Sequence, residues 1–185
     1  MTLLTTSTPA RPVSHVRRRA LTTAVAVLGL GILLGVLWWV AAPMARADVA
    51  AGQAYLSGHQ ELQVAQDGWF AVVTGLAGVL AATLLALRLG RVAGSAGPAA
   101  ASAARSAALS AAKVPVLGVV VALVAWRTGV LLGPPSLADQ VAAGTTNPLT
   151  PLQLHAYGVL LVGPFLYTVT RFLAALFTAE PVAAG

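Results

Sequence analysis

The chain has few charged residues and no cysteine. Of its 185 residues only 9% are Asp, Glu, Lys or Arg, against about 25% in soluble globular domains. So few charges cannot cover a water-facing surface, which excludes an ordinary soluble domain. The lack of cysteine excludes disulfides, thiol catalysis and thiolate metal sites.

The sequence patterns of common enzymes are also missing. There is no G-x-S-x-G, H-E-x-x-H, P-loop or dinucleotide-binding glycine pattern. His15, His59 and His155 are scattered and have no metal-ligand spacing. The sequence therefore predicts no catalytic residue, no cofactor and no metal site, and it favours a protein that is not an enzyme.

Long apolar runs dominate the chain, which is 58% hydrophobic with a mean hydropathy of +0.84. Four stretches are long enough to cross the roughly 30 Å hydrocarbon core of a bilayer as helices. We predict an all-α polytopic membrane protein, a bundle of four transmembrane helices, in one domain over 20–178. The predicted spans are about 20–42, 68–87, 114–133 and 153–178.

Polar, Pro-rich or low-complexity segments separate these spans. Residues 1–19 are predicted to be a disordered basic tail, and 179–185 a second short tail. The loops are 43–67, 88–113 and 134–152; part of the first, AYLSGHQELQV, alternates loosely and suggests a short hairpin. The Ala-rich segment 99–112 favours a surface helix. A short loop between spans two and three makes them expected neighbours.

The basic residues predict the orientation. With both termini in the cytoplasm, the cytoplasmic segments hold eight Lys or Arg residues and the two outer loops hold only Arg46. Such a bias follows the positive-inside rule, so we expect an N-in/C-in multi-pass protein of the cell (plasma) membrane. The positive net charge of +6 is then a topology signal and not a sign of nucleic acid binding.

One alternative concerns the first span. The run Arg17–Arg19, the apolar stretch and Ala45-Arg46-Ala47 resemble a signal peptide with cleavage after Ala47. The apolar stretch has 23 residues, longer than the 7–15 of a typical signal peptide core. Retention is favoured, while cleavage would leave three spans.

Arg127 is the most informative residue because it lies about seven residues inside the third span. A charge at that depth costs a few kcal/mol unless it is paired or reaches water. The predicted partner is Asp67 at the outer start of span two, with Glu61 as second choice. Snorkelling to the interface, or contact with an anionic ligand or a partner subunit, are the alternatives.

Two further residue classes predict packing. Tryptophans near span ends are expected to act as interface anchors: Trp38, Trp39, Trp69 and Trp126. Small residues at helical spacing allow helices to approach closely, either within the bundle or in an oligomer: Gly31, Gly35, Gly78, Ala125, Gly129 and Gly133. Pro164 is expected to kink the fourth span.

Three segments carry a resemblance: WWVAAP (38–43), DGWF (67–70) and AWRTGVLLGP (125–134). In their order and spacing the chain resembles, over about 20–178, a family of small actinobacterial membrane proteins classed as a domain of unknown function. The resemblance implies a four-span envelope protein. It implies no activity and no catalytic residues.

The sequence leaves several functions open. The leading hypothesis is a non-enzymatic accessory or assembly partner of a cell-envelope membrane complex, with the lipid bilayer and a membrane protein or a second copy as its contacts. The alternative is a subunit of a small oligomeric transporter or channel in which Arg127 faces an anion. A lipid-handling enzyme using Asp67, Glu61 and Arg127 is the weakest hypothesis.

Overall fold

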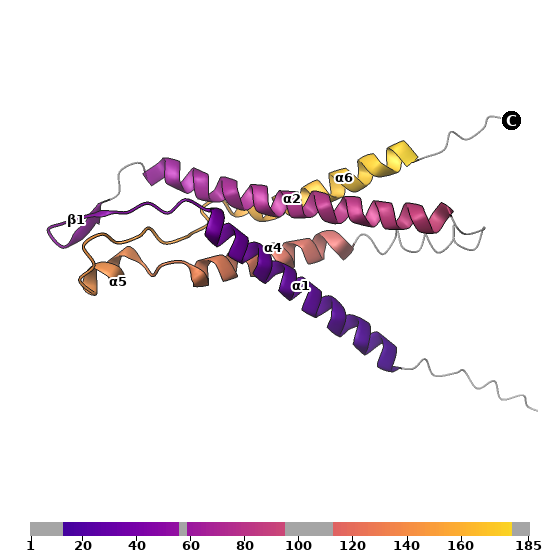
Figure 1. The fold of residues 1–185 in the computed structure, drawn as a ribbon, viewed down its shortest axis with the longest axis horizontal. Coiled ribbons are helices and arrows are strands. Elements are labelled where there is room, and N and C mark those ends of the chain that lie inside the picture. Colours follow the sequence, from indigo (N-terminus) through magenta and orange to yellow (C-terminus); the bar gives the residue numbers. More distant parts are fainter. Residues whose placement is uncertain (1–12, 56–58, 95–112, 179–185) are drawn as a thin grey trace, which may run out of the picture.

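The computed structural model describes residues 13–55, 59–94 and 113–178, and it is a bundle of long helices (Figure 1). The elements follow in the order α1 (Val13–Ala41), β1 (Asp48–Ala50), β2 (Gln53–Tyr55), α2 (His59–Gly94), α4 (Lys113–Leu132), α5 (Leu137–Ala142), the 3-10 helix η1 (Tyr157–Leu161) and α6 (Val162–Thr178). Strands β1 and β2 form one small antiparallel hairpin.

Four helical stretches in the described residues are long and apolar enough to cross a membrane, which confirms the predicted fold class. They are Ala20–Ala41, Gln60–Arg88, Val114–Ala142 and Tyr157–Phe177. Large apolar side chains such as Leu33, Leu80 and Phe165 point outward and are more than 60% exposed. A chain that exposes so many apolar side chains needs lipid around it.

Two helices extend beyond the predicted spans. Helix α1 begins at Val13, so the segment 13–19 assigned to a disordered tail is helical. Helix α2 begins at His59, nine residues before the predicted span. Both added segments lack Gly and Pro and contain good helix formers, and Glu61 in the first turn of α2 favours its start. Polar residues hid these turns because hydropathy marks only the apolar part of a helix.

The fourth span begins later than predicted. Residues 150–156 form neither helix nor strand, and helical structure starts with η1 at Tyr157. Pro164 is the third residue of α6, where a backbone N–H has no acceptor within the helix. The proline therefore lies at the start of a helix, and the expected kink within a continuous span is replaced by the change from η1 to α6.

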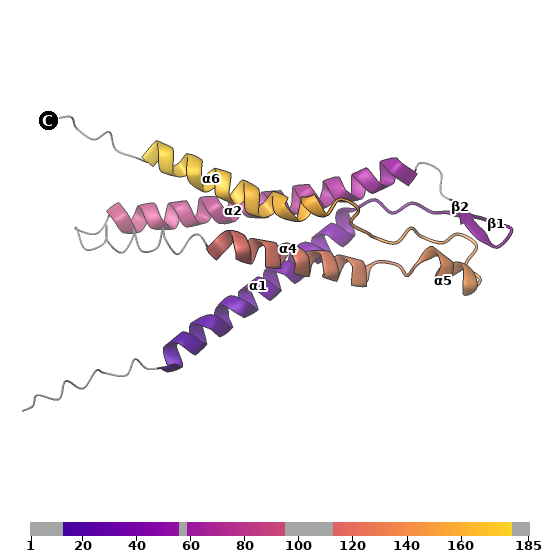
Figure 2. The ribbon, with the colours of Figure 1, turned by 180° about the vertical axis from the view of Figure 1, so that it is seen from behind.

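The helices pack as two pairs, α1 with α4 and α2 with α6, and α4 also contacts α6. Figures 1 and 2 show α1 crossing the other helices and its N-terminal half leaving them. The expectation that spans two and three are direct neighbours was wrong, because the direct partners of α2 and α4 are α6 and α1. Chain order did not determine the packing.

Glycines permit the two close approaches. A Cβ on Gly35 would lie 2.5 Å from the carbonyl oxygen of Ala125, and a Cβ on Gly129 would overlap the ring of Trp38. In the second pair, Gly78 lies directly against the backbone carbonyl of Gly163. Close backbone contact supplies the van der Waals packing that holds helices together in lipid.

The polar connections also fold differently from the prediction. The hairpin pairs Asp48 with Tyr55 and Ala50 with Gln53, so it precedes most of the segment 54–64 in which it was expected. Its turn residues Ala51 and Gly52 both have positive φ angles, as a two-residue type I′ turn requires. The suggested surface helix 99–112 lies outside the described residues.

We predict that Gly35→Leu lowers the melting temperature and the folded yield in detergent, because the added side chain forces α1 from α4. Overpacking of this kind costs about 1–3 kcal/mol. The matched control is Gly29→Leu, since a Cβ on Gly29 meets no atom within 4 Å. Equal melting temperatures for both variants would contradict the close packing of α1 on α4.

Candidate functional site

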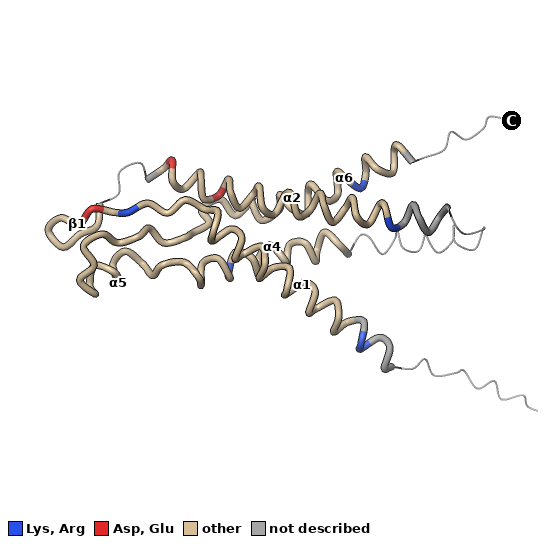
Figure 3. Tube along the Cα trace, viewed as in Figure 1, with Lys and Arg blue, Asp and Glu red and all other residues tan. Residues whose placement is uncertain are grey.

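Polar structure concentrates at one end of the bundle. We call it the loop end and define it as residues 42–55, 133–156 and the first three turns of α2. The acidic residues visible in Figure 3 lie toward this end, and several basic residues lie toward the opposite end. The loop end holds the predicted residues Asp67 and Glu61, so its geometry is the first candidate for a functional site.

Trp38 is the centre of the loop end. Its side chain is completely buried and meets the ring of Phe70 edge to face at a centroid distance of 5.0 Å. Its indole N–H donates to the backbone carbonyl of Gln66 at 3.0 Å. Trp38 therefore links α1 to α2, while its contact with Gly129 links both to α4.

Gln66 extends this contact into the two long connections. Its buried amide nitrogen donates to the carbonyl of Pro43 at 3.2 Å. Its amide oxygen lies 3.5 Å from the backbone N–H of Gln153. A buried amide must satisfy both donors and acceptors, so Gln66 fixes where both connections leave the helices.

Asp67 caps the start of η1. Its two carboxylate oxygens accept the backbone N–H groups of His155 at 3.0 Å and Ala156 at 2.8 Å. Ala156 is the N-cap residue of η1 and has no side-chain cap of its own. A carboxylate near a helix N-terminus is favoured by the exposed N–H groups and the helix dipole. Asp67 thus stabilises the segment that leads into η1.

The predicted ion pair between Arg127 and Asp67 is not formed; among the described residues the Asp67 carboxylate instead lies 3.9 Å from His155 Nδ1. The physical reason is the packing order, since α2 packs on α6 and brings Asp67 to the segment before η1. Glu61, the second choice, lies exposed in the first turn of α2.

Arg127 lies on the exposed face of α4. Its guanidinium stacks on the ring of Trp126 at 4.8 Å from the ring centroid. Trp126 in turn contacts Tyr157 edge to face at 5.8 Å. The position is five residues before the end of α4, about 7.5 Å from that end. The Arg side chain is long enough to extend from this depth toward interfacial water.

The other predicted anchors have different surroundings. Trp69 is 45% exposed, while Trp39 and Trp126 are partly buried against the core. Trp38 is completely buried, so its assignment as an interface anchor was wrong. The cause is Gly129, which leaves room for the ring, together with a backbone acceptor for the indole N–H.

Hydrogen bonds join the two long connections to each other. Ala45 and Thr150 exchange bonds, since Thr150 N donates to Ala45 O at 2.9 Å and Ala45 N donates to the Thr150 hydroxyl at 3.0 Å. Ala47 N donates to Pro148 O at 2.9 Å. The loop end is therefore one folded unit made from two segments about 100 residues apart.

The Gln140 side chain joins the two ends of the second connection, residues 133–156, by hydrogen bonds. Its amide nitrogen donates to the carbonyls of Pro135 and Leu149, and its oxygen accepts from Leu149 N at 2.9 Å. Helix α5 begins with a side-chain cap, in which Ser136 Oγ accepts from Asp139 N. Ser136 also donates to the Asp139 carboxylate at 2.6 Å.

Sequence reasoning missed Gln66, Gln140 and Thr150. All three are neutral polar residues that bind backbone groups. The partners of Gln66 and Thr150 are distant in sequence, whereas those of Gln140 lie five and nine residues away. The one available signal was a Gln immediately before Asp67 at the start of an apolar span. In the described ranges no cluster of three or more His, Asp or Glu side chains could hold a metal ion.

Comparisons with known proteins add no relative. No family model matches the chain, and neither the curated proteins nor the solved structures contain a match. The resemblance to an actinobacterial membrane family therefore stays a prediction.

We predict that Asp67→Ala lowers the melting temperature in detergent, because two backbone N–H groups lose their acceptor. Each unsatisfied donor costs about 1–3 kcal/mol. Asp67→Asn keeps one good acceptor and should lose less. The control is Glu61→Gln, which changes an exposed acid on the same helix. A melting temperature unchanged by Asp67→Ala would contradict the capping role.

Arg127→Leu should leave the stability of the purified monomer unchanged within about 0.5 kcal/mol, as is usual for an exposed position. The reason is that the Arg127 side chain is exposed and its guanidinium stacks on the face of a neighbouring ring. The measurement is the melting temperature in the same detergent. A fall in melting temperature as large as that of Asp67→Ala would contradict this prediction and would support the intrachain ion pair.

Proposed function

We propose that this protein is a non-enzymatic accessory or assembly partner of a cell-envelope membrane complex, and that its loop end binds a partner protein. The observation that carries the proposal is the joining of two distant connections into one folded unit outside the apolar spans. Loops that serve only as links between helices do not need such a network. A contact surface does need a fixed shape.

The use of the polar groups supports a binding role. The carboxylate of Asp67 accepts two backbone N–H groups, and that of Asp139 accepts from Ser136. Groups committed to backbone and cap contacts are poorly placed to transfer protons or bind a substrate phosphate. This favours a contact surface over an enzyme that handles lipids.

A shallow hollow at the loop end is a suitable contact surface. It lies between the hairpin turn at Gly52 and Gln53 and the residues Leu137, Ala138 and Val141 of α5. Apolar side chains that rim a hollow beside the hairpin favour a protein partner with a complementary apolar segment. We expect the partner to be another membrane protein, with the chain N-in/C-in in the cell membrane.

The exposed Arg127 supports a partner as well. An unpaired Arg at that depth is costly, and a carboxylate on a neighbouring protein's span would remove the cost. The second candidate is an oligomeric transporter or channel. In a pore between identical copies, the exposed Arg127 would face the anion that passes. Anion flux through liposomes that is abolished by Arg127→Ala but kept in Arg127→Lys would favour that candidate.

The proposal is tested by site-specific photo-crosslinking in native membranes. A photoreactive amino acid replaces Ala138 or Gln53 at the loop end, and Leu176 on α6 in a control variant. We expect one reproducible adduct with a different membrane protein from the loop-end positions and not from Leu176. Adducts that form equally at all three positions would overturn the proposal. It would also be overturned if no adduct formed and the chain purified as a monomer.

A further inference from the structure

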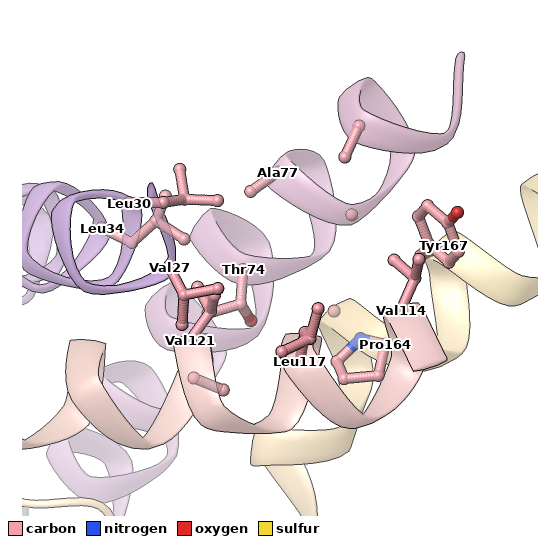
Figure 4. A pocket seen from close by; sticks show the side chains of 15 residues that line it. Val27, Leu30, Leu34, Thr74, Ala77, Val114, Leu117, Val121, Pro164 and Tyr167 are labelled. Carbon is pink, nitrogen blue, oxygen red and sulfur yellow. The ribbon is translucent and has the colours of Figure 1, made fainter. Parts of the chain in front are cut away.

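An apolar cavity lies between the four long helices. It has a volume of about 230 Å³ and is lined by residues of α1, α2, α4 and α6, among them Leu30, Ala77, Leu117 and Pro164 (Figure 4). An apolar cavity of about 150 Å³ is large enough to bind benzene. The space is therefore large enough for part of a hydrocarbon chain.

The walls of the cavity are almost entirely apolar, although its lining includes the buried Tyr167 hydroxyl, which has no hydrogen-bond partner among the described residues. The hydroxyl of Thr74, which lines it, already donates to the carbonyl of Phe70 at 2.8 Å. In Figure 4 the hydroxyl of Tyr167 lies on the side of its ring away from the other labelled side chains. Hydrocarbon is the chemistry that fits these walls.

A groove continues from the cavity along α1. A second hollow is lined by Thr22, Thr23 and Ala26, and it shares Val27, Leu30 and Val121 with the cavity. From Leu30 to Thr22 the groove follows α1 for about 12 Å. It exists because the N-terminal half of α1 leaves the other helices (Figures 1 and 2), so none of the helices in the described ranges covers it.

Positive charge lies beyond the end of this groove. Arg17 and Arg18 are exposed on α1, about one turn before Thr22. Guanidinium groups bind phosphate through charge-assisted hydrogen bonds. An apolar groove that ends one turn from two exposed arginines has the charge and shape of a phospholipid with one chain inserted and an anionic headgroup.

We propose that the cavity and groove hold one acyl chain of an anionic phospholipid whose phosphate lies at Arg17 and Arg18. Dispersion contacts supply the attraction for the chain, because an empty cavity forfeits them on every wall. The two arginines supply the preference for an anionic headgroup. The lipid fills the space between the α1–α4 and α2–α6 pairs, and the proposal rests on no feature of the loop end.

The test is native mass spectrometry of the full chain, purified in mild detergent and mixed with equal amounts of phosphatidylglycerol and phosphatidylcholine of the same acyl length. We expect one retained lipid per chain, with phosphatidylglycerol retained in preference. Equal retention of both lipids, or no retained lipid, would overturn the proposal. A dimer that retains no lipid would assign the groove to a second copy and would also overturn it.

Variants separate the chain site from the headgroup site. Ala26→Leu and Ala77→Leu narrow the groove and the cavity, and both should lose the retained lipid. Ala24→Leu is the control, because Ala24 is exposed on α1 and lies outside both linings. Thermal unfolding verifies that each variant is folded. If Ala77→Leu does not fold, Ala26→Leu still tests the groove, because Ala26 is exposed.

The headgroup site is tested by Arg17→Gln with Arg18→Gln. This double variant should still retain a lipid but lose the preference for phosphatidylglycerol. Arg88→Gln, which removes an exposed charge from α2, is the control and should keep the preference. If Ala26→Leu retains lipid as Ala24→Leu does, or if the double variant keeps its preference, the proposal is wrong.

Discussion

The burial of Trp38 is the interaction on which the rest of the structure depends. Its ring packs against Gly129 of α4 and Phe70 of α2, and its N–H is bound by the carbonyl of Gln66. These contacts join the α1–α4 pair to the α2–α6 pair at the loop end. Toward the other end α1 leaves the bundle, and the interhelical cavity and groove open there.

The structure of the loop end follows from a second constraint, which is that polar groups near lipid need hydrogen-bond partners. Gln66 and Asp67 satisfy backbone groups of both long connections, and Gln140 satisfies those around α5. Within the spans, Thr74 and Thr83 donate to carbonyls of their own helix, as side chains in an apolar environment do. The result is a rigid surface on apolar helices, and this arrangement supports a binding role.

Charge is arranged to complement this architecture. Arg127 stacks on Trp126 and is exposed on α4. Arg17 and Arg18 lie exposed at the opposite end of α1, near the groove. The proposals assign different contacts to the two sites, a carboxylate or an ion at one end and a lipid phosphate at the other.

The four apolar spans and their helical form were determined by the sequence alone, because lipid requires every backbone group to be bonded within a helix and apolar length is a local property. Helix starts at Val13 and His59 escaped prediction because polar turns carry no hydropathy signal. Only the tertiary structure decided the partners of Trp38, Asp67 and Arg127. The partners of these residues depend on which helices pack together. Lipid is as apolar as the helix surfaces, so hydropathy does not determine which helices pair. Close backbone contact at Gly35, Gly78 and Gly129 determined the pairs.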